Sequence, residues 1–246
     1  MDRAVISNWR LGVPADFVPL EPNVIEKHDK CQAGNAGMLK LRSVSSVILQ
    51  TELRCFVKIL QDRILKDGKV LPGNIIKVDG FLNHRVDISL LKDIADEFYR
   101  IFGNKKPTLI LTVEASGIAL AAITAERFGI PMLFAKKAKS DNIEGGLYKS
   151  EIYSYTYKKT VSLIVSAEWL KAEDRVLVID DFLANGEALR GVIDIVHQAG
   201  AELVGVGVAV EKGFQPGGQK LRDLGYDLHS LAIIDKADES GIDFRG

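Results

Sequence analysis

The chain has 246 residues, 47% of them hydrophobic and 26% charged, which is ordinary for a globular protein of one or two domains. A net charge of −1 indicates neither a nucleic-acid surface nor a membrane surface, and no apolar run approaches the roughly 18 residues of a membrane helix. Two cysteines without a CxxC pattern argue against a zinc site or disulfide framework and fit a reducing cytoplasm.

The N-terminal part differs from the rest. Residues 1–56 contain three of the seven prolines and little hydrophobic periodicity, so we expect an N-terminal extension there that is either disordered or a mis-assigned start. Its acidic residues and lack of an apolar stretch argue against a secretory signal. Residues 57–246 are expected to form one functional domain. It opens with helical spacing over 57–68 and a short strand over 74–80.

Helices and strands then alternate regularly. Strands that are apolar on both faces and alternate with helices are typical of a parallel sheet covered on both sides. The sequence therefore predicts an α/β domain with a doubly wound, mostly parallel sheet. The predicted helices span 87–103, 118–129 and 186–200, and the predicted strands span 108–113, 131–136, 176–179 and 202–211.

One segment, residues 136–167, interrupts this alternation. It begins basic and glycine-rich and then alternates polar and apolar residues, which predicts a hairpin. The pattern alone favours a solvated hairpin slightly, and a lid over a site is the alternative.

The segment VLVIDDFLANGEAL, residues 176–189, ends a buried strand with Asp180 and Asp181 and then turns into a helix. Ligands of open α/β sheets bind at the carboxyl ends of the strands. Free backbone N–H groups at a helix start bind anions, and carboxylates bind hydroxyls or Mg²⁺. The segment thus predicts a sugar-phosphate site, and an acidic N-cap on an ordinary helix is the alternative.

Three further strand ends carry weaker signals. The turn Ala115–Ser116–Gly117 offers a second anion site, for which a plain serine-capped turn is an equal alternative. Lysines from Lys136 onward could balance bound anions, although such a cluster is usually a solvated face. Lys212 and Phe214 follow the last strand and could hold a planar ring with oxygen substituents; a surface lysine and a core phenylalanine are the more common arrangement.

Four segments together resemble the type I phosphoribosyltransferase family, and within it the bacterial xanthine phosphoribosyltransferases. The segment at 176–188 alone resembles the family's phosphoribosyl-diphosphate signature, and the other three make the resemblance specific for the purine. The resemblance runs from about Val57 almost to the end of the chain. The four segments are KVDGFLNHRVD (77–87), VEASGIA (113–119), VLVIDDFLANGEA (176–188) and VEKGFQPG (210–217).

The resemblance implies transfer of the ribose 5-phosphate of phosphoribosyl diphosphate to N9 of xanthine, giving xanthosine 5′-monophosphate and diphosphate in purine salvage. It implies Mg²⁺ bound mainly through phosphoribosyl diphosphate, with no direct protein ligand assigned. It implies a cytoplasmic homodimer that binds neither nucleic acid nor membrane. The implied fold is the type I phosphoribosyltransferase fold, with the hairpin as a lid and a small hood from both ends of the domain.

The resemblance also implies a role for each matching residue. Asp180 and Asp181, the expected catalytic residues, would face the ribose hydroxyls. The other expected contacts are Ala184, Asn185, Gly186, Glu187 and Ala188 for the 5′-phosphate; Ala115, Ser116 and Lys136 for the diphosphate; and Ile76, Asn83, Lys212 and Phe214 for the purine.

The sequence departs from the family in two places. Some related oxopurine transferases carry an acidic residue where this chain has Ala184, so the general acid or base for the purine stays unassigned. Residues 1–56 have no counterpart, which suggests a start site assigned too far upstream.

Two alternative functions stay open. The chain could transfer to guanine, hypoxanthine or adenine, or it could be a non-catalytic purine repressor that senses phosphoribosyl diphosphate. The nearly neutral charge of residues 1–56 disfavours a DNA-binding domain there.

Overall fold

The computed structural model describes residues 58–138, 146–154 and 159–245. The predicted extension, residues 1–56, lies outside these ranges, as does part of the segment 136–167. The main sheet has eight strands in the order β10-β9-β8-β7-β3-β4-β6-β5. Their bounds are β3 Leu109–Val113, β4 Met132–Ala138, β5 Leu147–Ser154, β6 Lys159–Ser166, β7 Arg175–Leu183, β8 Glu202–Lys212, β9 Leu228–Asp238 and β10 Gly241–Phe244.

Five neighbouring strands, β9-β8-β7-β3-β4, run parallel in the middle of this sheet. Antiparallel strands close it at both sides, β10 beside β9 and the β5–β6 pair beside β4. All five residues of β3 are buried, as an apolar strand covered on both faces must be. The predicted doubly wound, mostly parallel sheet is confirmed.

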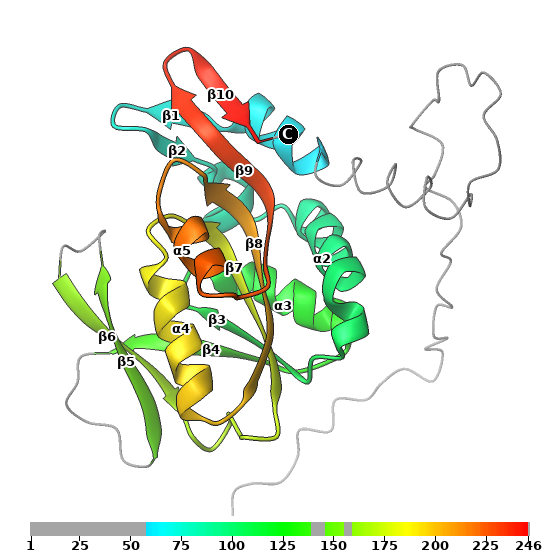
Figure 1. The fold of residues 1–246 in the computed structure, drawn as a ribbon. Helices are drawn as coiled ribbons and strands as arrows, with labels where there is room; N and C mark the ends of the chain where they lie inside the picture. The colour runs from blue at the N-terminus through cyan, green and yellow to red at the C-terminus, as the bar shows by residue number, and fades with distance from the viewer. Residues whose placement is uncertain (1–57, 139–145, 155–158, 246) are drawn as a thin grey trace, which may run out of the picture. The chain divides into compact units, whose positions relative to one another are not determined.

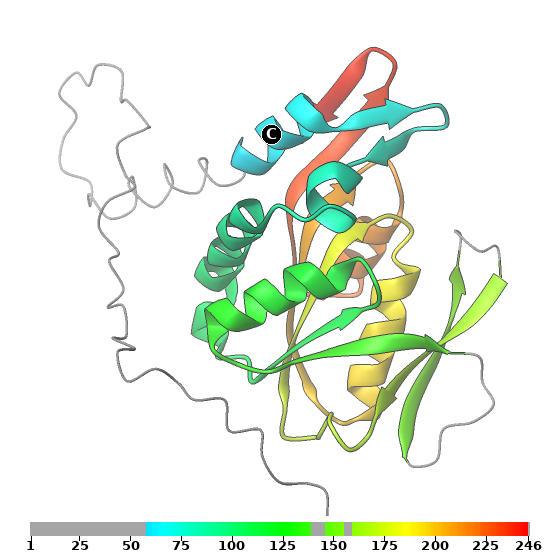
Figure 2. The same ribbon diagram turned by 180° about the vertical axis from the view of Figure 1, so that it is seen from behind.

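Helices cover the two faces of the sheet. Figure 1 shows α4 (Glu187–Gln198) and α5 (Gly217–Asp223) in front of it, and Figure 2 shows α2 (Ile88–Phe102) and α3 (Gly117–Phe128) on the opposite face. Each face has its own hydrophobic core, one around Phe98 of α2 and the other around Val192 of α4. Asp87 caps α2, since its side chain accepts a hydrogen bond from the backbone N–H of Leu90 at 3.2 Å. No helix in the described ranges has the length and apolar character needed to cross a bilayer.

Both ends of the described chain contribute to a small hood. A helix over residues 58–67 and the two-stranded sheet of β1 (Lys69–Leu71) and β2 (Ile75–Lys77) lie beside β9 and β10 (Figure 1). The predicted strand over 74–80 is too long, because a π-helix, η1 (Asp79–Asn83), follows β2. In η1 the side chains of Phe81 and Leu82 are buried in the core beside α2, and this tertiary burial outweighs the local strand pattern.

The predicted hairpin is present as β5 and β6. Because β6 pairs with β4, the hairpin extends the main sheet, and its apolar side packs on α4. The packing is tight at Gly191 of α4, where a Cβ would lie 2.5 Å from Ile152 and 3.0 Å from Leu163. Closure of the hairpin over a ligand stays a prediction.

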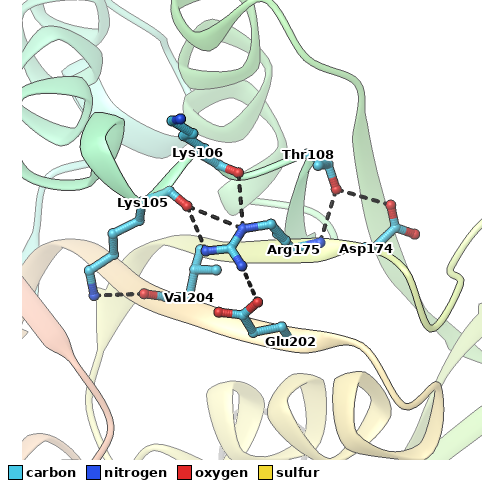
Figure 3. Close-up of polar contacts among 7 residues, drawn as sticks. All are labelled: Lys105, Lys106, Thr108, Asp174, Arg175, Glu202 and Val204. Carbon is cyan, nitrogen blue, oxygen red and sulfur yellow. Dashed lines mark hydrogen bonds and ion pairs between the residues drawn. The ribbon is translucent and has the colours of Figure 1, made fainter.

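A polar network fixes the amino edge of the sheet, opposite the ends of β7 and β8 that carry the predicted site (Figure 3). The guanidinium group of Arg175, at the start of β7, donates to the carbonyl oxygens of Lys105, at 2.8 Å, and Lys106, at 3.3 Å, and pairs with Glu202 at the start of β8. The ammonium group of Lys105 donates to the carbonyl oxygen of Val204 at 2.8 Å. These bonds tie the short helix after α2, η2 (Gly103–Lys105), to both strands.

Candidate active site

The two predicted catalytic residues lie within β7, not after it. The sequence predicted that this strand ends at residue 179, but β7 continues to Leu183 because it stays paired with β8 as far as Glu211. Asp180 is 6% exposed and Asp181 is 2% exposed. The strand therefore holds two adjacent carboxylates on a rigid, buried backbone.

Asp181 connects three segments that are far apart in the sequence. Its Oδ1 accepts a hydrogen bond from the hydroxyl group of Ser116, and its Oδ2 accepts one from the side-chain amide of Asn83, both at 2.8 Å. Ser116 precedes α3, and Asn83 ends the π-helix of the hood. The structure thus brings together one residue from each of the segments predicted to bind ribose, diphosphate and purine.

Asp180 lies in a different environment. Burial raises the pKa of its carboxyl group well above the ordinary value of 3.8, and the neighbouring charge of Asp181 raises it further. The backbone N–H of Asp181 donates to Asp180 Oδ1 at 3.0 Å and offsets only part of this rise. A Cβ at Gly117 would lie 2.8 Å from the same oxygen, so only a glycine lets the start of α3 come this close. Asp180 therefore holds a proton more tightly than an exposed aspartate does.

A cavity of about 200 Å³ opens beside this pair. The predicted phosphate residues line it together with Asp180, and Gly186, at φ +84°, directly precedes α4. The first N–H groups of an α-helix have no partner inside the helix and bind anions. The five predicted residues in the lining are Ala184, Asn185, Gly186, Glu187 and Ala188, called here the phosphate turn.

The start of α5 is in direct contact with the phosphate turn. The backbone N–H of Gly217 donates to the carbonyl oxygen of Ala184 at 3.1 Å. A Cβ at Gly217 would overlap that oxygen and would lie 2.6 Å from the backbone nitrogen of Gly186. Only a glycine at this position allows α5 to come into direct contact with the turn.

The predicted purine residues lie at the end of β8 and in the hood. Lys212 Nζ lies 3.5 Å from the carbonyl oxygen of Asn74 and 5.8 Å from the ring centroid of Phe182. Burial lowers the pKa of Lys212 below its ordinary value. Ile76 of β2 is buried, and Phe214 is 37% exposed, which leaves its ring free to contact a ligand.

The sequence analysis missed one residue near the site, Phe182. Phe182 lines the cavity, and its ring centroid lies 5.8 Å from Lys212 Nζ, so it connects the residues predicted to bind phosphate to those predicted to bind the purine. The sequence feature that could have identified Phe182 is its position directly after Asp180 and Asp181. Of the lysine cluster, Lys137 lines the cavity, whereas the described contact of Lys136 is with the ring of Phe134 at 5.9 Å. A diphosphate contact for Lys136 stays a prediction.

The turn Ala115–Ser116–Gly117, which is predicted to bind diphosphate, is fixed by a contact of the residue before it, Glu114. The peptide bond between Glu114 and Ala115 is cis, and the Glu114 carboxylate accepts a hydrogen bond from the backbone N–H of Lys137 at 2.6 Å. Among the residues that the structure describes, no group of three or more His, Cys, Asp or Glu side chains could hold a metal. Asp180 and Asp181 supply the oxygen donors that Mg²⁺ prefers, so they fit this ion only if a ligand supplies further oxygens.

The chain is similar to known proteins over most of its described length. The sequence model of the phosphoribosyl transferase domain family matches residues 85–245 of this chain. The xanthine phosphoribosyltransferase of Lachnoclostridium phytofermentans is 53% identical over 192 residues, which cover 77% of this chain and 99% of that protein. The xanthine phosphoribosyltransferase of Bifidobacterium adolescentis is 50% identical and is covered over its full length, against 77% of this chain.

Solved structures show the same fold. The adenine phosphoribosyltransferase of Giardia lamblia, in complex with 9-deazaadenine, has a TM-score of 0.61 at 23% identity and covers 72% of this chain and 96% of its own. The adenine phosphoribosyltransferase of Thermoanaerobacter pseudethanolicus has a TM-score of 0.51 at 26% identity, covering 60% and 81%. These similarities show the fold and do not indicate which purine base the chain uses.

Proposed function

Because the chain belongs to the phosphoribosyl transferase domain family, we propose that it is an enzyme that transfers the ribose 5-phosphate of phosphoribosyl diphosphate to N9 of xanthine. The products are xanthosine 5′-monophosphate and diphosphate, and the reaction serves purine salvage. One observation carries the proposal: xanthine phosphoribosyltransferases at 49% to 53% identity match this chain over nearly their whole length.

The phosphoribosyl half of the substrate fits the cavity beside β7. We place the 5′-phosphate on the backbone N–H groups of the phosphate turn and the ribose hydroxyls on Asp180 and Asp181. Breaking the ribose–diphosphate bond builds positive charge on the sugar and negative charge on the leaving group. Fixed groups stabilise such charges without reorganising during the reaction. The carboxylate of Asp181, held by two donors, would face the positive sugar.

The leaving diphosphate would lie at the Glu114–Gly117 turn, at the start of α3. Bound Mg²⁺ would be held by diphosphate oxygens near Asp180 and Asp181 and would neutralise the charge of the leaving group. The ammonium group of Lys137, which lines the cavity, adds a positive charge on the same side.

The purine would lie between the hood and the end of β8. Lys212 can donate only hydrogen bonds, so it favours a carbonyl oxygen at this place and disfavours the amino group of adenine. Phe214 would stack on the ring, and Asn83 would contact its edge. Since Asn83 donates to Asp181 in the ligand-free protein, base binding and ribose binding both involve the same amide group.

Initial-rate assays with xanthine, guanine, hypoxanthine and adenine, each with phosphoribosyl diphosphate and Mg²⁺, test the proposal. We expect kcat/KM to be highest for xanthine and lowest for adenine. Turnover of guanine or hypoxanthine as fast as xanthine would overturn the choice of base, and no turnover of any base would favour the repressor alternative.

We further propose that the enzyme acts as a homodimer in the cytoplasm. Sedimentation velocity of the full chain gives the oligomeric state, and cell fractionation gives the location. A monomer at enzyme concentrations that support turnover would exclude the dimer.

A further inference from the structure

Glu211 is a buried carboxylate that the proposed reaction does not use. It lies in β8 directly before Lys212 and is 2% exposed. It accepts two hydrogen bonds from the guanidinium group of Arg222, at 2.8 and 2.7 Å, and one from the hydroxyl group of Ser230. Burial by itself would raise the pKa of Glu211, but these donors outweigh it, and the pKa lies below the ordinary value. Glu211 is thus charged and fully paired.

Such a pair is not expected to add much to the free energy of unfolding. A buried ion pair often contributes no more than two well-packed apolar side chains would, because both charges must be removed from water. A bidentate arginine–carboxylate contact does, however, fix the distance and the orientation between two elements. Its main effect is therefore expected to be geometric.

The pair spans the segment that joins the two halves of the site. Glu211 lies at the end of β8 and Arg222 lies on α5, and the residues between them include Lys212 and Phe214. Successive side chains of a strand point to opposite faces. A fixed Glu211 therefore fixes the opposite direction of Lys212, toward the hood.

The first turn of α5 packs tightly between Glu211 and the phosphate turn. On one side, a Cβ at Gly218 would lie 2.5 Å from the carboxylate carbon of Glu211. On the other side, Gly217 donates to Ala184 and leaves no room for a side chain against Gly186. A shift of α5 relative to β8 would therefore move the backbone N–H groups that are proposed to bind phosphate.

We propose that Glu211 and Arg222 are a positioning pair, which holds α5 against the phosphate turn and so sets the affinity for phosphoribosyl diphosphate. The inference rests on the proposed function, and Arg222 acts through Glu211 and α5 without touching a substrate.

The test compares Arg222→Met with Arg175→Met. Arg175 is the control, because it also pairs with a glutamate, the more exposed Glu202, and anchors the start of β7, away from the site (Figure 3). Calorimetry with phosphoribosyl diphosphate and Mg²⁺, without a base, gives Kd, and thermal unfolding gives Tm. We expect Arg222→Met to raise Kd about tenfold or more, as a misplaced binding group does. We expect Arg175→Met to lower Tm and leave Kd unchanged.

Two more variants separate position from stability. Glu211→Gln combined with Arg222→Met leaves no unpaired buried charge, so Tm should recover while Kd stays raised. Arg222→Lys keeps the charge but loses the bidentate fork, so it should raise Kd by a smaller factor of about three. This conservative variant carries the test if Arg222→Met does not fold.

Clear results would overturn the inference. They are an unchanged Kd in a folded Arg222 variant, an equal rise in Arg175→Met, or a double variant that regains Kd together with Tm. Because the Kd is measured without a base, a wrong choice of purine leaves the test intact. Failure of the unaltered protein to bind phosphoribosyl diphosphate would refute the proposed function itself.

Discussion

Replacing Gly217 with alanine should damage the phosphate turn while leaving the fold in place. The new Cβ would lie 2.6 Å from the backbone nitrogen of Gly186 and 2.7 Å from the carbonyl carbon of Asn185, whereas real Cβ atoms stay at least 3.0 Å from such neighbours. These neighbours are backbone atoms and cannot rotate away. Helix α5 and the phosphate turn must therefore move apart by several tenths of an ångström.

The expected cost to stability is small. Overpacking of this kind costs about 1–3 kcal/mol. Alanine gains back up to about 1 kcal/mol over glycine in a helix. For a domain of this size a net loss of about 1–2 kcal/mol lowers Tm by about 2–8 °C.

The expected cost to binding is larger. A hydrogen bond to a charged group contributes about 1.5–3 kcal/mol, so misaligning one N–H group of the phosphate turn should weaken phosphoribosyl diphosphate binding by about 10- to 100-fold. The KM for xanthine should change much less, because Lys212 lies on β8 and not on the displaced turn.

Kd for phosphoribosyl diphosphate with Mg²⁺, KM for both substrates and Tm are the measurements. Gly103→Ala is the control, since its Cβ would meet the ring of Tyr99 at an ordinary 3.6 Å and its backbone is helical. The reasoning is refuted if Gly217→Ala binds phosphoribosyl diphosphate as tightly as the unaltered chain, or if the control weakens binding equally.

Three further predictions concern the charged groups of the site. Lys212→Met should raise the KM for xanthine by about 10- to 100-fold with little change in the KM for phosphoribosyl diphosphate, and initial rates that show equal changes in both would contradict its role. Burial lowers the pKa of Lys212, so kcat/KM for xanthine should begin to fall with rising pH below the ordinary lysine value of 10.5. Lys212→Arg, measured across the same pH series, should not show this fall, because arginine keeps its charge. The raised pKa of Asp180 means that the folded state binds this proton more tightly than the unfolded state, so its contribution to stability is present below about pH 4 and is lost as pH rises through the folded pKa. Asp180→Asn should therefore raise Tm at neutral pH but not near pH 4 while lowering activity, and a Tm that falls at neutral pH would show that the buried carboxyl group is not penalised.

The parallel core of the fold could be predicted because each buried strand is a continuous apolar run. The strands predicted at 108–113, 131–136, 176–179 and 202–211 correspond to β3, β4, β7 and β8. The hood could not be predicted in detail. Its π-helix depends on packing against distant segments, which leaves no periodic signal in the local sequence. The sequence analysis also missed β9, the fifth parallel strand of the main sheet, which pairs with β8.

The sequence by itself determined which chemical groups reach the carboxyl edge of the sheet, because polar residues that follow buried apolar runs must emerge there. Only the tertiary structure decided which of these groups meet. Ser116 and Asn83 converge on Asp181, Lys137 lines the cavity together with the phosphate turn, and Arg222 pairs with Glu211. The two partners of Asp181 lie 98 and 65 residues away along the chain. Contacts over such separations follow from strand order, register and close packing, which no local sequence pattern encodes.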